Sequence, residues 1–323
     1  MYDFRSICRV KMPTRINECV STMAITPELN DLLPELIQTL TVHSGVILQA
    51  PPGSGKTTQV PLAFLDVDWL EGQKILMLEP RRLAARACAR YMASLLGESV
   101  GQRVGFRVRQ ESKVSARTRI EVVTEGILTR MLQNDPGLEG YGLVIFDEFH
   151  ERSLQADLGL ALCREVQQAL REDLKILLMS ATLASERLSQ LLEFPVLSCQ
   201  GRQYPVELRY APVPVNQPLI PFVSCLITQT LAQESGSLLV FLPGAGEIKS
   251  VQKQLSESLQ DRSDISLHPL YGDLSAREQD AAIQPAASGQ RKVVLATNLA
   301  ETSLTIEGIR IVIDSGQARV PFF

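Results

Sequence analysis

The sequence predicts an α/β protein built from two consecutive halves, each with a mostly parallel β-sheet. Short, continuously apolar runs that suit buried parallel strands alternate with helix-like segments along most of the chain. A proline-rich stretch that begins near residue 210 interrupts this alternation, which then resumes. With 323 residues, the chain is too long for one ordinary domain and fits about two.

The first half follows an N-terminal stretch, residues 1–26, that shows no periodicity and is expected to be poorly ordered. Apolar residues at helical spacing predict a helix within PELNDLLPELIQTL, residues 27–40. The first domain is expected to span residues 27–200. Its predicted strands and the main helices between them are strands 46–50, 74–79, 119–124, 143–147 and 175–180, and helices 82–96 and 153–170.

The second half is expected to begin after a connector. Four prolines in YAPVPVNQPLIP disfavour a helix or a central strand, so residues 201–222 are interpreted as a linker region. The second domain is expected to span residues 223–323. Its predicted strands are 237–242, 265–270, 292–297 and 310–314.

Composition excludes several classes of protein. Hydrophobic residues make up 45% and charged residues 21%, which excludes disorder of the whole chain. The net charge of −4 argues against a protein that coats nucleic acid by bulk charge, and no apolar run is long enough to predict a membrane partner. The six cysteines are scattered and form no C-x-x-C pair, so neither zinc nor disulfides are expected and a cytoplasmic location is the natural interpretation. Nothing indicates an oligomeric state.

The strongest local signal is a glycine-rich loop between a predicted strand and a helix-like segment. Its glycines let the backbone wrap around a phosphate chain, Lys56 can neutralise phosphate charge, and Thr57 can offer a hydroxyl to Mg²⁺. Ala50 stands where the general G-x-x-x-x-G-K-[ST] pattern has its first glycine. ATP and Mg²⁺ are therefore the predicted cofactors, and the predicted nucleotide-binding residues of the loop are Ala50, Pro51, Pro52, Gly53, Ser54, Gly55, Lys56, Thr57 and Thr58.

Two carboxylates follow the apolar strand LVIFD. Asp147 and Glu148 come at its carboxyl end, where ligands bind in open α/β sheets. Asp147 is expected to hold Mg²⁺ together with Thr57 through the hydration shell, and Glu148 to orient or deprotonate the attacking water. A metal site of histidines and carboxylates is less favoured, because His43 and His268 lack ligand spacing.

These elements occur within an ordered series of motifs that resembles the DEAH/RHA group of superfamily 2 helicases, and most of all its bacterial HrpB-type members. The resemblance runs from about residue 30 to the end of the sequence. Phe149 stands where the name of the DEAH box has alanine. The motifs are, in order, APPGSGKTT, EPRRLAA, TEGILTR, DEFHER, SAT, LVFLPGAGEI, LYGDLSAREQ and ATNLAETSLTIEGI.

The resemblance implies two RecA-like domains, the use of ATP or several NTPs, and single-stranded nucleic acid, RNA in particular, as partner. It implies catalytic roles for Lys56, Asp147, Glu148 and His150, and a role for Ser180 and Thr182 in linking hydrolysis to domain closure. It also implies that Glu301 and Thr302 lie near the nucleotide. The positions expected to contact nucleic acid are Arg81, Arg82, Thr124, Gly244 and Thr297.

The residues themselves add one argument about nucleic acid. Residues 79–130 carry 11 Lys or Arg against 5 Asp or Glu, a net charge of +6 within a chain of −4. Such a segment suits phosphate contacts that do not depend on base sequence. For any single arginine, an ordinary solvated surface remains the more favoured interpretation.

A Q-R-x-G-R-x-G-R segment, which these helicases carry after ATNLAETS, does not occur in this sequence. We therefore expect the second domain to be C-terminally incomplete and the chain to be the N-terminal portion of a larger helicase. Three alternatives stay open: a nucleotide- and RNA-binding fragment with little turnover, a P-loop motor that acts on DNA, and, more remotely, a small-molecule kinase.

Overall fold

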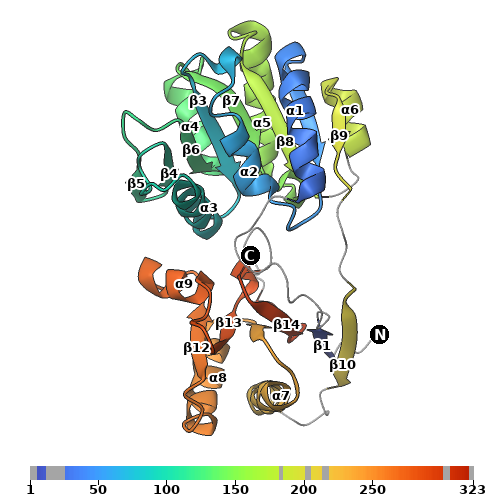
Figure 1. Ribbon diagram of the computed structural model, residues 1–323, viewed down its shortest axis with the longest axis vertical. Coiled ribbons are helices and arrows are strands. Elements are labelled where there is room, and N and C mark those ends of the chain that lie inside the picture. The colour runs from blue at the N-terminus through green and yellow to red at the C-terminus, as the bar shows by residue number, and fades with distance from the viewer. Residues whose placement is uncertain are drawn as a thin grey trace. The chain divides into compact units, whose positions relative to one another are not determined.

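The computed structural model describes residues 6–11, 26–181, 185–200, 205–212, 218–300 and 306–319. The chain divides into two compact units. Residues 20–202 form the first unit, and residues 1–19 together with 203–323 form the second. Each unit has a mostly parallel sheet and packed helices (Figure 1), which confirms the predicted α/β fold class. Within these ranges, no helix has the length and apolar character that crossing a membrane requires.

The first unit is built on an eight-stranded sheet with the order β5-β4-β6-β3-β7-β8-β2-β9. Neighbouring strands are parallel throughout, except that β4 and β5 are antiparallel. The central strands β3 and β7 are buried on both faces, which is why their sequences are continuously apolar. The strands are β2 (Gly45–Gln49), β3 (Lys74–Glu79), β4 (Val104–Val108), β5 (Glu111–Lys113), β6 (Ile120–Thr124), β7 (Tyr141–Phe146), β8 (Lys175–Ser180) and β9 (Val196–Ser198).

Helices cover both faces of this sheet. Alternate residues of β3 enter opposite cores, so that Ile75 and Met77 pack with α1, α2 and α3, whereas Leu76 and Leu78 pack with α4, α5 and α6. Short 3-10 turns lie at Asp68–Leu70 and Phe149–Glu151. The helices are α1 (Pro27–Val42), α2 (Lys56–Ala63), α3 (Arg82–Leu95), α4 (Glu125–Asn134), α5 (Leu154–Ala169) and α6 (Ser185–Leu192).

The second unit has a six-stranded sheet with the order β10-β1-β14-β11-β13-β12. The strands β14, β11, β13 and β12 are parallel, and β1 is antiparallel to both of its neighbours. Helices α7 (Leu219–Gln233) and α8 (Ala245–Ser258) share one apolar core with the sheet, and α9 (Ala276–Ile283) packs against β12. The strands are β1 (Ser6–Lys11), β10 (Glu207–Pro212), β11 (Ser237–Phe241), β12 (Ile265–Leu270), β13 (Arg291–Ala296) and β14 (Ile309–Asp314).

Two expectations about connecting segments differ from the structure. Residues 1–26 were expected to be poorly ordered, but Ser6–Lys11 forms β1 between β10 and β14. The expected linker 201–222 contains the strand β10 and the start of α7. Its prolines allow both elements, because β10 is an edge strand that ends at a proline and a proline is tolerated in the first turn of a helix.

Candidate active site

The predicted phosphate loop runs from the end of β2 to the start of α2. Gly53 has a φ of 77° and Gly55 a φ of 89°, a left-handed conformation that side chains other than glycine adopt only with strain. A Cβ atom at Gly53 would meet nothing within 4 Å, so this part of the loop opens to solvent. The loop is anchored by backbone hydrogen bonds, in which Ala50 N donates to Ser180 O at 3.0 Å and Thr26 N to Ser54 O at 3.1 Å. No side chain caps the start of α2, and the amides of an uncapped helix start suit an anion.

Lys56, the first residue of α2, forms an ion pair with Glu148. Its Nζ donates to Glu148 Oε1 at 2.9 Å, and its side chain is only 4% exposed. Burial lowers the pKa of Lys56, but the negative charges of Asp147 and Glu148 outweigh burial and raise it above its usual value. Lys56 is therefore a buried cation that Glu148 neutralises and that an incoming phosphate can take over.

Asp147 and Glu148 follow β7 in a tight turn. Glu148 N donates to Asp147 Oδ1 at 2.8 Å, and Glu148 itself has a φ of 48°, which is uncommon for a residue other than glycine. Asp147 is 5% exposed, and its Oδ2 has no hydrogen-bond donor among the described residues. Burial, then the neighbouring Asp147, raises the pKa of Glu148, while Lys56 opposes this rise. A raised pKa suits a carboxylate that accepts a proton from water.

His150 links the acidic turn to the end of β8. Its Nδ1 lies 3.3 Å from Glu148 Oε2, and Ala181 N donates to the same nitrogen at 3.4 Å. Because Nδ1 cannot donate to the carboxylate and accept from the amide in one tautomer, these two contacts compete. The structure thus brings the predicted His150 and the Ser180-Ala181 end of β8 together, whereas Thr182 lies outside the described residues.

Glu79 is a site residue that the sequence reasoning missed. It ends β3 beside the acidic turn, is 0% exposed, and neither of its carboxylate oxygens has a hydrogen-bond donor among the described residues. Burial, then the charge of Asp147, raises the pKa of Glu79 well above its usual value. The signal that could have found it is the one used for Asp147, namely an acidic residue at the end of an apolar strand next to the loop.

The nucleic-acid positions predicted in the first unit lie at the same edge of its sheet. Glu79 and Thr124 are paired in register at the ends of β3 and β6, so Arg81 and Thr124 occupy neighbouring strand-to-helix turns. Arg81 Nη2 lies 3.8 Å from Glu151 Oε2, and Arg82 is exposed. Arg81, Arg82 and Thr124 therefore lie at the carboxyl edge of the first sheet, the edge at which the phosphate loop also lies.

Much of the remaining basic segment is neutralised within the first unit. Three of its arginines, Arg86, Arg103 and Arg107, pair with Glu111, Glu98 and Glu121 at 3.1, 2.8 and 2.8 Å. Both partners of each pair lie within residues 79–130, so the net charge of +6 already accounts for these pairs and is carried by the other basic side chains of the segment.

Two of the site residues predicted in the second unit lie at the same edge of its sheet, and two others lie outside the described residues. Gly244 precedes α8 after β11, and Thr297 follows β13, the neighbouring parallel strand, so both lie at the carboxyl edge of that sheet. A Cβ at Gly244 would lie 3.0 Å from Arg319 Nε. Glu301 and Thr302 lie outside the described residues.

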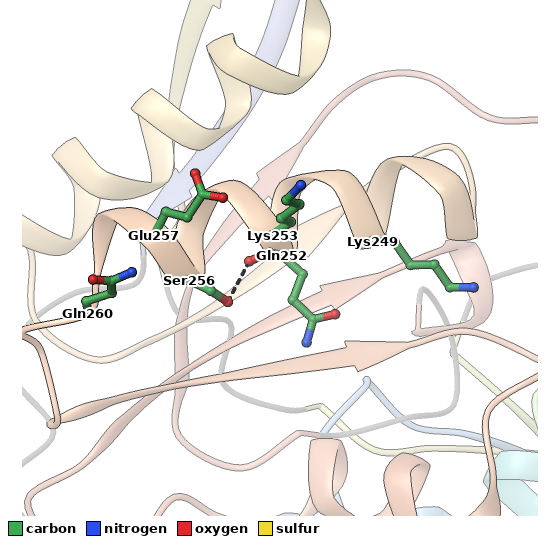
Figure 2. Close-up of a pocket in the computed structure, with 6 residues that line it drawn as sticks. All are labelled: Lys249, Gln252, Lys253, Ser256, Glu257 and Gln260. Atoms are coloured by element: carbon green, nitrogen blue, oxygen red, sulfur yellow. Dashed lines mark hydrogen bonds between the residues drawn. The ribbon is translucent and has the colours of Figure 1, made fainter.

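A shallow depression on the second unit offers no comparable chemistry. The side chains that line it all project from one helix, α8 and its end, and Figure 2 shows that they do not converge on a common point. Its only drawn hydrogen bond runs from Ser256 Oγ to Gln252 O, at 2.8 Å, within the helix itself. Among the described residues, no group of three or more His, Cys, Asp or Glu is placed to hold a metal ion. The first unit therefore carries the candidate active site.

The loop, the buried Lys56–Glu148 pair and Asp147 at the end of a parallel strand define a P-loop protein of the nucleoside triphosphatase class. Comparison with known proteins makes this assignment more specific. Residues 34–191 match the DEAD/DEAH box helicase family, and residues 221–319 match the helicase conserved C-terminal domain. The chain therefore resembles the DEAD/DEAH box helicases over its first part and carries a helicase C-terminal domain in its second.

The chain is similar to several curated helicases of bacteria. It is 57% identical over 293 residues to the ATP-dependent RNA helicase HrpB of Escherichia coli, covering 90% of this chain and 36% of that protein. It is 36% identical to the ATP-dependent RNA helicase HrpA of Borreliella burgdorferi, again covering 90% of this chain and 35% of the relative. The chain thus spans about a third of the length of these two relatives.

Solved structures agree with this placement. The crystal structure of the Escherichia coli DEAH/RHA helicase HrpB matches with a TM-score of 0.83 and 55% identity, over 91% of this chain and 37% of that one. A second crystal structure, of the Escherichia coli DExH-box NTPase HrpB, matches with a TM-score of 0.73 at the same identity. The predicted resemblance to the DEAH/RHA group and its HrpB-type members is confirmed.

Proposed function

We propose that the chain is the nucleotide-binding and RNA-contacting portion of a DEAH-type ATP-dependent RNA helicase. The observation that carries this proposal is the buried Lys56–Glu148 ion pair at 2.9 Å, directly beneath the start of α2 and beside Asp147. This arrangement supplies a cation for phosphate, a carboxylate for a metal and a carboxylate for water within one loop cluster.

The residues present fit a magnesium ion. Asp147 Oδ2 is buried without a hydrogen-bond donor among the described residues, so a cation or its water would satisfy it. Carboxylate and hydroxyl oxygens are the ligands that Mg²⁺ prefers, and Thr57 and Asp147 supply one of each. When bound, the ion would neutralise charge on the phosphate oxygens.

The chain's own residues would then divide the work. The amides at the start of α2 and Lys56 would bind the phosphates, and Lys56 would leave Glu148 in doing so. Glu148, released from the lysine, would orient the attacking water and take its proton. A movement of Glu148 would alter the hydrogen bond between His150 and Ala181, since His150 contacts both Glu148 and Ala181.

We further propose single-stranded RNA as the polymer bound at the carboxyl edge of the first sheet. Arg81, Arg82 and Thr124 support this, because they lie together at that edge and their charges and hydroxyl suit phosphate and sugar. Several arginines nearby are already paired, so we expect few contacts and a shallow dependence on salt. The printed names of the relatives, ATP-dependent RNA helicases, favour RNA over DNA.

Turnover by these 323 residues alone is proposed to be slow. No Q-R-x-G-R-x-G-R segment occurs in the sequence, and arginines that reach a transferring phosphate typically account for about 10³ to 10⁵ in rate. The chain would therefore bind nucleotide and RNA well and hydrolyse nucleotide poorly.

The test combines binding and turnover on the same protein. ATP and ADP binding is measured by calorimetry, hydrolysis with and without single-stranded RNA or DNA, and RNA binding by filter retention. Lys56→Ala should weaken nucleotide binding strongly, whereas Lys249→Ala, which changes an exposed lysine of α8, should leave it unchanged. Fast RNA-stimulated turnover that Lys56→Ala removes would refute slow hydrolysis, and equal binding by Lys56→Ala would refute the site.

A further inference from the structure

Glu79 is the last residue of β3, and Asp147 directly follows the neighbouring strand β7 at the same edge of the sheet. The register pairs Leu78 of β3 with Phe146 of β7, and Asp147 N donates to Leu78 O at 3.1 Å. The next residue of β3, Glu79, is therefore level with Asp147 at the edge where the phosphate loop lies. Both side chains are almost completely buried.

The donors around Glu79 are engaged elsewhere. The ammonium group of Lys56 donates a hydrogen bond to Glu148. The thiol of Cys88 donates to Thr57 O at 3.6 Å. Both oxygens of Glu79 and Oδ2 of Asp147 thus form a cluster of three buried acceptors that no donor of the described residues satisfies. A buried carboxylate without donors costs free energy, so the site holds this cluster at the expense of stability.

A second buried glutamate of the same sheet shows the usual solution. Glu121 on β6 is also 0% exposed, but Arg107 Nε lies 2.8 Å from its Oε1 and the Tyr141 hydroxyl donates to its Oε2 at 2.8 Å. Glu121 therefore has an ion-pair partner and one hydrogen-bond donor from the protein, although its Oε1 accepts no hydrogen bond. Glu79, at the ligand edge, receives none.

We propose that Glu79 is a second acidic positioning residue of the nucleotide site, whose carboxylate accepts hydrogen bonds from the water shell of the divalent cation held by Asp147 and Thr57. This inference rests on the proposed function. Glu79 does not contact the reacting phosphate in this scheme, and its action passes through cation-bound water. Direct ligation is not favoured, because no group of three or more His, Cys, Asp or Glu among the described residues is placed to hold a metal ion.

The experiment measures cation binding rather than turnover. Mn²⁺ is titrated into the protein in the presence of ADP and followed by electron paramagnetic resonance, for the parent chain, Glu79→Gln and Glu79→Met. Loss of an outer carboxylate typically lowers metal affinity about 10- to 100-fold. We expect that loss in Glu79→Met and a smaller one in Glu79→Gln, whose amide oxygen still accepts a hydrogen bond.

Stability supplies the second readout. Trp69, the only tryptophan of the chain, lies in the first unit and reports its unfolding in urea. Without nucleotide and cation, both Glu79 variants should unfold at the same or a higher urea concentration than the parent, because a buried carboxyl group without a hydrogen-bond donor has been removed. The matched control Glu121→Gln should do the reverse, with a lower midpoint and unchanged Mn²⁺ affinity.

The outcomes separate the two proposals. If the parent chain binds neither ADP nor Mn²⁺ with ADP, the proposed function and this inference both fail. If the parent binds and both Glu79 variants bind Mn²⁺ equally well, only the inference is overturned. A lower urea midpoint with unchanged Mn²⁺ affinity would likewise overturn it, since that is the behaviour of a residue that merely supports the fold.

Discussion

The Lys56–Glu148 ion pair predicts that Glu148 competes with the phosphate of a nucleotide for Lys56, so that Glu148→Gln binds nucleotide more tightly than the parent chain. The two groups meet at 2.9 Å with side chains 4% and 11% exposed, so the pair is shielded from water. Hydrogen bonds to charged groups contribute about 1.5–3 kcal/mol, and phosphate must replace this bond to reach Lys56. Since about 1.4 kcal/mol corresponds to a factor of ten, affinity for ADP should rise about 10- to 100-fold in Glu148→Gln.

Calorimetric titration with ADP measures this change, and Lys56→Met supplies the second side of a double-mutant cycle. In the Lys56→Met background, Glu148→Gln should have little effect on affinity, because the pair is already absent. Asp157→Asn is the control, since it removes a carboxylate from an exposed ion pair with Arg152 in the same unit and should leave ADP affinity unchanged. An affinity of Glu148→Gln equal to or below that of the parent would refute the competition between Glu148 and phosphate.

Two further predictions concern stability. Gly45→Ala would place a Cβ 2.1 Å from the buried ring of Phe194, so the first unit should lose about 1–3 kcal/mol, seen as a lower urea midpoint of Trp69 fluorescence; an unchanged midpoint would show that Phe194 moves freely. Burial lowers the pKa of Lys292 from 10.5 to about 8. Between pH 8 and 10.5, the folded state therefore binds fewer protons than the unfolded state, so the free energy of unfolding of the second unit should rise by about 1–3 kcal/mol over this range. Circular dichroism in urea would measure this rise, and Lys292→Met should remove it; an equal rise in the variant would assign it to other groups.

The parts of the fold that local sequence could predict are those buried on both faces. The bounds of β3 and β8 match the predicted strands, because a continuous apolar run suits a covered parallel strand. The antiparallel pair β4 and β5 was missed, since Gly105 and Arg107 interrupt the apolar pattern of β4. Its burial depends on packing of Phe106 against α3 and other elements, which no local pattern reveals.

The second unit shows a different limit of sequence reasoning. The strand β1 pairs with β10 and β14, about 200 and 300 residues further along the chain. Pairing at such separations is decided by tertiary contacts rather than by the composition of the six residues. The prolines near β10 misled for a related reason, because an edge strand has fewer ladder hydrogen bonds to lose than a central one.

The site was more predictable than the fold around it, because its chemistry restricts residue type and spacing together. Lys56 and Glu148 are 92 positions apart, yet the loop motif and the acidic strand end assign them to one site, and their side chains meet at 2.9 Å. The competition of Glu148 and Ala181 for His150 could not be predicted in this way, because it depends on the turn at Glu148 and its positive φ. The complete burial of Glu79 could not be predicted from the sequence either.

These features of the first unit have a common electrostatic origin. Three carboxyl groups lie with a single lysine: those of Glu79 and Asp147 are buried and that of Glu148 is 11% exposed, so the site has more acidic than basic groups. Burial and mutual repulsion raise the pKa of Glu79 and Glu148, which is the response of a site whose charges are not balanced by the protein. A phosphate alone would add to this negative charge, whereas a phosphate that arrives with a divalent cation brings the missing positive charge with it. The acidic excess thus favours the metal-bound nucleotide over the free one, and the same excess explains why Lys56 is paired with Glu148 and has a raised pKa.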